Sequence, residues 1–159
     1  MVNQRNVCVT AVDGNTGFLI TELLLTNDTF KSKITSVCGL SLHPTSAKAK
    51  ELGTKGCKII HHKPGRMRQM VETLKQTGCD TLCLIPPAHE HKYDITEELV
   101  NAAKKADIQN VCFISSVGCD LAEKEKQPRL REFIELETLV LSTKGDSSTQ
   151  LGHSPCVIR

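Results

Sequence analysis

Residues 7–25 read VCVTAVDGNTGFLITELLL, a short apolar stretch that passes through two glycines into an apolar, helix-forming segment. A dinucleotide-binding fold holds a pyrophosphate at such a junction, because the first N–H groups of a helix lack internal partners and carry partial positive charge. Gly14 and Gly17 have the expected spacing, but Ile20 stands where a third glycine would let the helix pack closely on the strand. Two glycines at a strand–helix turn also occur for backbone reasons alone. The rest of the sequence has to decide between these interpretations.

Apolar strands and helices alternate along the whole chain. The expected strands are residues 7–12, 34–42, 57–61, 81–85, 111–115 and 156–158. The expected helices are residues 17–26, 47–52, a segment between Pro64 and Gly78, 93–106 and 130–141. Continuous apolar strands that alternate with helices predict a parallel sheet covered on both faces, in a three-layer α/β/α domain that spans residues 1–159. The chain stops at Arg159 within its last expected strand, which suggests a truncated version of a longer protein.

The composition narrows the class of protein. A net charge of +2 over 159 residues gives no basic footprint for nucleic acid or for an anionic membrane. No segment approaches the roughly 20 apolar residues of a membrane span, and Met1–Asn6 lacks the apolar core of a signal peptide. These features predict a cytoplasmic protein, with a nuclear location also open.

Eight cysteines are present, and most lie within or beside the expected strands. Free cysteines in such places behave as small hydrophobic side chains, and a cytosolic protein keeps them reduced. No Cys or His pair has metal-ligand spacing, so no metal is expected. Cys119 lies in a glycine-containing turn and is the thiol expected to be most exposed and reactive.

Several segments, taken in order, resemble the NmrA-like group of atypical short-chain dehydrogenases/reductases. They are Val9-Thr10 with residues 14–19 (GNTGFL), residues 43–49 (HPTSAKA), 56–60 (GCKII), 84–87 (LIPP), 110–118 (NVCFISSVG) and 154–159 (SPCVIR). The resemblance implies a Rossmann-type NAD(P)-binding domain with strand order 3-2-1-4-5-6. It also implies a choice of functions, since the group contains redox-sensing transcriptional regulators that bind the cofactor without turning it over and NADPH-dependent reductases.

The resemblance assigns cofactor contacts position by position. The phosphate loop is Gly14, Asn15, Thr16, Gly17, Phe18 and Leu19; Pro86 and Pro87 follow strand four along the cofactor; Ser115, Ser116 and Val117 form the turn on the nicotinamide side. The arginine that holds a 2′-phosphate in the family is Leu42 here, and no acidic residue nearby replaces it as a ribose ligand. His43, Ser46 and Lys48 offer other contacts to a phosphate, which favours NADP over NAD.

The sequence also bears on catalysis. Classical reductases of this fold use Tyr-x-x-x-Lys, in which the lysine lowers the pKa of the tyrosine. The single tyrosine, Tyr93, is followed four residues later by Glu97 and lies on the helix after strand four. No catalytic residue is therefore assigned. Arg131 lies roughly where the family has a lysine, and it receives no role. Two His-containing segments, residues 61–68 (HHKPGRMR) and 89–91 (HEH), fit solvated helix starts better than a phosphate, base or metal site.

Three functions remain open. The preferred hypothesis is a nucleotide-sensing regulatory domain that binds NAD(P) with little or no catalysis and passes its state to a protein partner. The second is an NAD(P)H-dependent oxidoreductase whose substrate side is completed by residues beyond Arg159. The third is a degenerate scaffold that binds no nucleotide.

Overall fold

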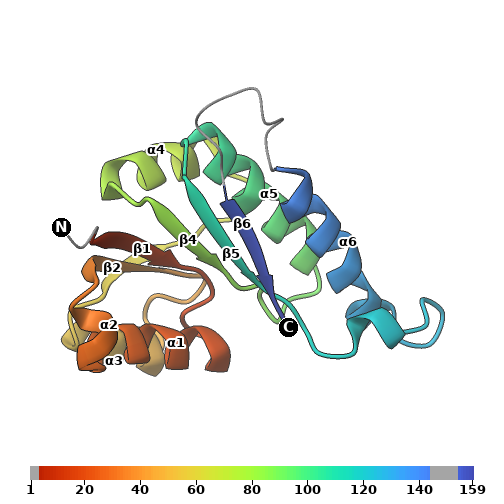
Figure 1. Cartoon of the computed structure of the whole chain (residues 1–159), viewed down its shortest axis with the longest axis horizontal. Coiled ribbons are helices and arrows are strands. Elements are labelled where there is room, and N and C mark those ends of the chain that lie inside the picture. Colours follow the sequence, from red (N-terminus) through yellow and green to blue (C-terminus); the bar gives the residue numbers. More distant parts are fainter. Residues whose placement is uncertain (1–3, 144–153) are drawn as a thin grey trace.

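The computed structural model describes residues 4–143 and 154–159, and its strands form one parallel sheet (Figure 1). The strands are β1 (Arg5–Val9), β2 (Ile34–Ser41), β3 (Lys58–His61), β4 (Thr81–Leu84), β5 (Asn110–Ile114) and β6 (Ser154–Ile158). Their order is β3-β2-β1-β4-β5-β6, and every neighbouring pair is parallel. The predicted α/β class and strand order are confirmed.

Helices cover both faces of the sheet. The helices are α1 (Asn15–Thr26), α2 (Asp28–Lys31), α3 (Ala47–Thr54), α4 (Met67–Thr77), α5 (Lys92–Lys105) and α6 (Pro128–Ser142), with a 3-10 turn η1 (Cys119–Leu121). In Figure 1, α1, α2 and α3 gather beside β1 and β2, whereas α4, α5 and α6 lie on the opposite side. The short α2 and η1 were not predicted, because four or three residues carry no helical periodicity.

Side chains that alternate along the strands build a separate apolar cluster on each face. Cys8 and Leu82 pack towards α4, α5 and α6, whereas Val7, Val9 and Cys83 pack towards α1 and α3. Strands buried on both faces read as continuous apolar runs, which is why the sequence predicted them well. Gly78, with φ +64, closes α4 in the left-handed conformation that favours glycine.

Two cysteines differ from their predicted environments. Cys119 was expected to be exposed, but its side chain is buried because η1 folds against α6. Cys156 was expected to lie in a strand of the core, but it is exposed on the edge strand β6. Cys8, Cys38, Cys57, Cys79 and Cys83 are buried and free, as predicted. Across the described parts of the chain, every helix is too short or too polar to cross a membrane.

Candidate functional site

The turn between β1 and α1 begins earlier than the sequence predicted. The first strand was expected to reach Val12, but β1 ends at Val9 and Ala11 adopts φ +50, in the left-handed region that non-glycine residues seldom use. Backbone strain of this kind is concentrated at ligand sites. The carbonyl of Ala11 accepts the N–H of Gly14 at 3.0 Å, so the chain reverses within four residues and starts the helix at Asn15.

The start of α1 presents N–H groups that have no acceptor among the described residues. Gly14 is the N-cap and has no side chain to accept a hydrogen bond. The N–H groups of Asn15, Thr16 and Gly17 belong to the first helical turn, which has no acceptor within the helix. Gly14, Asn15 and Thr16 are exposed. This helix start therefore has the geometry of an anion site of the kind that holds a phosphate.

Gly17 is the residue at which α1 comes closest to the turn after β1. The glycine pattern predicts this close approach at position 20, which is Ile20. A Cβ atom on Gly17 would lie 2.2 Å from the carbonyl oxygen of Ala11 and 2.9 Å from the Cα of Val12. Ile20 lies one turn further along and packs against the apolar cluster of this face. Ile20 therefore does not set the spacing between α1 and the residues that precede it in the predicted phosphate turn, residues 10–17.

Thr10 joins the turn after β1 to the segment after β4. Its buried hydroxyl donates to the carbonyl oxygen of Ile85 at 2.9 Å and accepts the N–H of Ile85 at 2.7 Å. Ile85 directly precedes Pro86 and Pro87, so the phosphate turn and the predicted cofactor-lining segment are held side by side at the carboxyl ends of their strands. Ligands of open α/β sheets bind at this edge.

The segment after β2 reaches the same turn through Lys48. The Lys48 ammonium donates to the side-chain oxygen of Asn15, which brings a cation from α3 to the start of α1. The Ser46 hydroxyl caps α3 by accepting the N–H of Ala49 at 3.2 Å. His43 is exposed beside it. Of the three residues predicted to replace the missing arginine, Lys48 is the one in contact with the phosphate turn.

Pro86 and Pro87 line a groove of about 410 Å³ between the start of α5 and the start of α6. Lys92, which sequence reasoning missed, is buried at its floor. Its ammonium donates to the carbonyl of Arg129 at 2.6 Å, pairs with Glu132 at 3.0 Å and lies 4.2 Å from the ring centre of Phe133. These contacts occupy Lys92 in holding α5 to α6.

A buried carboxylate stands at the end of β5. Glu137 on α6 accepts the Ser115 hydroxyl at 2.5 Å, the Cys119 thiol at 3.5 Å, and two nitrogens of Arg159 at 2.9 and 2.7 Å. The Arg159 guanidinium is the main cause that holds the pKa of Glu137 below its usual range, against the opposing effect of burial. Glu137 is four residues after Phe133 and three before Val140, so it lies on the apolar face of α6. A charged residue at such a position is the feature of the sequence that could have indicated a buried carboxylate.

These contacts limit what Ser115 can do chemically. A carboxylate only accepts hydrogen bonds, so the Ser115 hydroxyl hydrogen is committed to Glu137 and its oxygen lone pairs remain as acceptors. Ser115 is thus suited to receive an amide or hydroxyl donor and unsuited to give a proton to a substrate. Ser116 is the next residue, partly buried, and its carbonyl accepts the N–H of Cys119 at 3.3 Å.

Tyr93 lies on α5, where the sequence placed it, and Glu97 lies one turn further along. Desolvation is the first cause that raises the pKa of the Tyr93 phenol, and the charges of Glu97, Glu135 and Asp94 add to it. An activated tyrosine needs the opposite shift.

Arg131 lies on α6 and donates to the carbonyl of Asp120 at 3.4 Å. Within the described residues, no group of His, Cys, Asp or Glu is arranged to hold a metal.

The segment after β3 differs in part from its predicted solvated state. His61, Lys63, Arg66 and Arg68 are exposed, but His62 is only 3% exposed. The backbone N–H of His62 donates to the carbonyl of Ser41 at 2.8 Å. In the imidazole ring, Nε2 has no hydrogen-bond partner among the described residues.

Burial lowers the pKa of His62, and the His61 charge adds to this, while the charges of Glu98 and Asp13 oppose it. His62 is therefore neutral near neutral pH.

We expect His62 to make the protein acid-sensitive. As the pH falls below about 6.5, the unfolded chain binds a proton that the buried imidazole does not, so the free energy of unfolding falls by at most about 1.4 kcal/mol per pH unit and levels off below the pKa of the folded state. Urea unfolding at a series of pH values measures this loss. His62→Gln is expected to remove this part of the pH dependence, and His89→Gln, at an exposed position, to keep it. Parallel pH profiles for wild type and His62→Gln would contradict the assignment.

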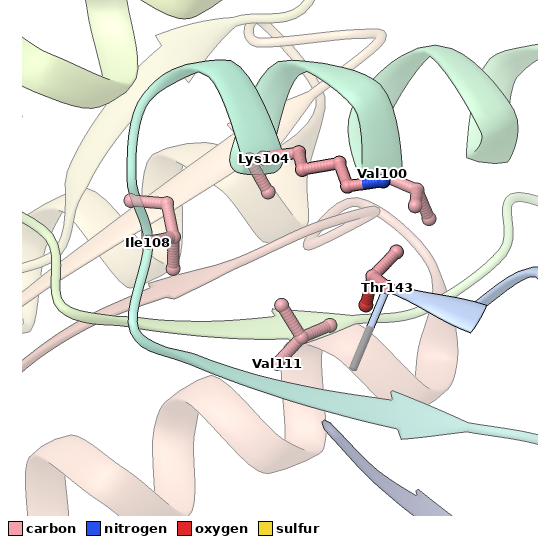
Figure 2. A pocket seen from close by; sticks show the side chains of 6 residues that line it. Val100, Lys104, Ile108, Val111 and Thr143 are labelled. Atoms are coloured by element: carbon pink, nitrogen blue, oxygen red, sulfur yellow. The ribbon is translucent and has the colours of Figure 1, made fainter. Parts of the chain in front are cut away.

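A small cavity at the opposite edge of the sheet is unrelated to this site. It has a volume of about 10 Å³ and lies between the ends of α5 and α6 and the start of β5. Figure 2 shows Val100, Lys104, Ile108, Val111 and Thr143 around it. The cavity is about the size of one water molecule and its lining is mainly apolar. It is too small to bind a ligand larger than water.

Comparison with known proteins shows which solved structures share the fold of this chain. No protein-family model matches the chain, and no curated protein sequence matches it significantly. Among solved structures, an NADPH-dependent quinone oxidoreductase of Escherichia coli in complex with NADPH aligns with a TM-score of 0.68 and 21% identity, over 86% of this chain and 45% of that one.

Triphenylmethane reductase of Citrobacter sp. with NADP(H) aligns with a TM-score of 0.69 and 16% identity, over 86% of this chain and 45% of that one. The Bordetella bronchiseptica enzyme WbmH with NAD⁺ aligns with a TM-score of 0.67 and 14% identity, over 90% of this chain and 54% of that one. The chain thus spans about half the length of the structures it matches. These likenesses establish the fold: a Rossmann-type parallel sheet shared with proteins whose structures contain NADPH, NADP(H) or NAD⁺.

Proposed function

We propose that this chain binds a nicotinamide dinucleotide at the carboxyl edge of its sheet and acts as a nucleotide-sensing regulatory domain with little or no hydride transfer. The observation that carries the proposal is the start of α1. There the exposed Gly14 and the first-turn N–H groups lie beside the Lys48 ammonium, and together they offer the donors and the positive charge that suit a phosphate. The structural likeness to proteins that contain NADPH, NADP(H) or NAD⁺ supports the same ligand class.

The predicted contact residues fit such a ligand to different degrees. Asn15, Thr16 and Gly17 would bind the pyrophosphate through their N–H groups, and Lys48 would contact the 2′-phosphate of NADP beside them. Pro86 would line the path of the dinucleotide, with Thr10 holding that segment in place. The lone pairs of Ser115 would accept a donor on the nicotinamide side. The N–H of Phe18 already donates to the carbonyl of Gly14 at 3.0 Å, so any contact of Phe18 or of Leu19 would have to come from elsewhere on the residue.

Among the described residues, neither the Ser115 hydroxyl nor the Tyr93 phenol is suited to donate a proton at this site, which supports sensing rather than reduction. Reduction of a carbonyl or quinone needs a donor to the developing oxyanion. The Ser115 hydroxyl donates to Glu137, and the Tyr93 phenol lies on α5 with a raised pKa. In a sensor, the cofactor favours one conformation of the segments after β1 and β4, and a protein partner favours another. Thr10 links these two segments, so a shift in one is transmitted to the other.

Calorimetric titration with NADPH and NADH at low salt tests the ligand, and NADPH absorbance in the presence of a small quinone tests turnover. Saturable binding without turnover is the expected result. Turnover on the order of 1 s⁻¹ or faster would favour the oxidoreductase alternative. A folded chain that gives no binding heat with either nucleotide would overturn the proposal and favour the scaffold.

Lys48→Ala is expected to weaken NADPH binding about threefold to tenfold, because one charge-assisted hydrogen bond at a partly exposed site contributes roughly 0.7–1.4 kcal/mol. NADH binding should change less, since NADH lacks the 2′-phosphate, and this difference would support the predicted preference for NADP. Lys50→Ala is the matched control, because Lys50 is exposed on the same helix. The measurement is the dissociation constant of each variant for NADPH and for NADH. Equal effects of the two substitutions would remove Lys48 from the site.

A further inference from the structure

Three cysteines form a row across neighbouring strands on one face of the sheet. Cys83 on β4 is in register with Cys112 on β5, and Cys112 is in register with Cys156 on β6. Directly paired residues of parallel strands point to the same face. The row therefore places three thiols side by side, far apart in sequence and outside the proposed nucleotide contacts.

Exposure increases along this row towards the edge of the sheet. Cys83 is buried, Cys112 is partly buried and Cys156 is exposed. The helices of this face, α1, α2 and α3, contact β2 and β3 at the other end of the sheet and gather there in Figure 1. The remaining five cysteines are buried. Cys112 and Cys156 are thus the two thiols that a small reagent reaches in the folded chain.

The middle thiol has the environment of a reactive cysteine. The neighbouring Cys83 thiol, and to a smaller extent the Cys156 thiol, lower the pKa of Cys112 to about 7 against the opposing effect of burial. The neighbouring Cys112 thiol, together with burial, raises the pKa of Cys83. The thiolate is the nucleophilic form of cysteine. A substantial fraction of Cys112 is consequently reactive at neutral pH, whereas Cys83 stays protonated.

We propose that Cys112 and Cys156 are a peroxide-sensitive pair, in which a small hydroperoxide oxidises Cys112 and Cys156 then closes a disulfide between β5 and β6. In the first step, the Cys112 thiolate attacks an oxygen of the hydroperoxide, the O–O bond breaks, and the departing oxygen takes a proton. Cys112 becomes a sulfenic acid, oxidised by two electrons. In the second step, the Cys156 sulfur loses its proton and attacks Cys112, and the sulfenic oxygen leaves as water. With hydrogen peroxide, two thiols and one peroxide yield one disulfide and two waters.

The strand spacing permits this bond. Neighbouring strands lie about 4.7–4.9 Å apart, and disulfides span Cα separations of roughly 4.4–6.8 Å. The separation is near the short end of that range, where a disulfide is more easily reduced, as suits a reversible modification.

Peptide mapping of the full chain after treatment with stoichiometric hydrogen peroxide tests the proposal. The expected result is a peptide pair joined through Cys112 and Cys156, with the loss of the two thiols that react with Ellman's reagent in the folded protein. Oxidation should be about threefold to tenfold faster than that of glutathione at neutral pH, because a larger thiolate fraction outweighs its lower intrinsic nucleophilicity. A disulfide to Cys83, a disulfide between two chains, or a rate equal to that of glutathione would overturn the proposal.

Substitutions separate the two steps. Cys156→Ser should accumulate a sulfenic acid on Cys112 that dimedone traps, and Cys112→Ser should leave Cys156 no more reactive than glutathione. Cys79→Ser, a matched change at a buried cysteine, should form the same disulfide as wild type. Dimedone labelling of Cys156 in place of Cys112 would reverse the assigned roles and contradict the proposal. If a variant fails to fold, the mapping of the unmodified sequence still decides the outcome.

Discussion

Gly17→Ala is expected to lower the free energy of unfolding by about 3 kcal/mol or more, because a methyl group at this position collides with backbone atoms that have no room to move. The new Cβ would lie 2.2 Å from the carbonyl oxygen of Ala11 and 2.7 Å from its carbon. That carbonyl also accepts the N–H of Gly14, so relief of the collision would open the phosphate turn. Urea unfolding measures the loss, and calorimetry should show NADPH binding weakened along with it.

Gly53→Ala is the matched control. Gly53 lies within α3, and a Cβ there would meet only a side-chain atom of Ile59 at 3.9 Å. Alanine is a better helix former than glycine, so this variant should gain about 0.5–1 kcal/mol. The two substitutions are chemically identical and should have opposite signs. A Gly17→Ala protein as stable as wild type would show that α1 does not pack on the turn as described.

Thr10→Val is expected to cost about 2–4 kcal/mol although it preserves the shape of the side chain. It removes both hydrogen bonds to Ile85 and leaves a buried N–H and a buried carbonyl without partners, each worth roughly 1–3 kcal/mol. The segment that carries Pro86 would also lose its link to the phosphate turn. We therefore expect weaker NADPH binding in addition to the lower stability, measured by calorimetry and urea unfolding.

Two further variants distinguish the hydroxyl from the side-chain volume. Thr10→Ser keeps the hydrogen bonds and should recover most of the stability. Thr138→Val removes an exposed hydroxyl that donates to the carbonyl of Ile134 within α6, and it should change stability by no more than about 0.5 kcal/mol. If Thr10→Val were as mild as Thr138→Val, the bridge between the segments after β1 and β4 would be unimportant.

The sequence predicted the sheet well because local signals coincide with tertiary burial. Strands such as residues 81–84 (TLCL) are apolar on both faces, and helices such as α4 end at a glycine that adopts the left-handed conformation. The errors lie at boundaries. β1 stops at Val9 because the Thr10 hydroxyl and the conformation of Ala11 begin the turn there, and neither contact has a signal in the local sequence.

The candidate site was predictable in outline and unpredictable in its contacts. The spacing of Gly14 and Gly17 predicted a tight turn before α1, which the structure has, and the absence of Tyr-x-x-x-Lys was evident from the residues alone. The burial of His62 was not, because it depends on segments that approach from other strands. Lys92 reads as an ordinary helix-surface charge until α5 and α6 pack together. The position of Glu137 on an apolar helix face was visible in the sequence, but its partners Ser115 and Arg159 were not.

The sequence by itself determined the alternation of strands and helices, the parallel sheet and the glycine-containing turn before α1, because these follow from hydrophobic periodicity and from backbone preferences within a few residues. The tertiary structure alone decided that Gly17 makes the close approach, that Cys119 is buried and Cys156 exposed, and that Cys83, Cys112 and Cys156 stand in one row. Register between strands and packing between helices set these contacts, and both bring together residues that are dozens of positions apart in the chain.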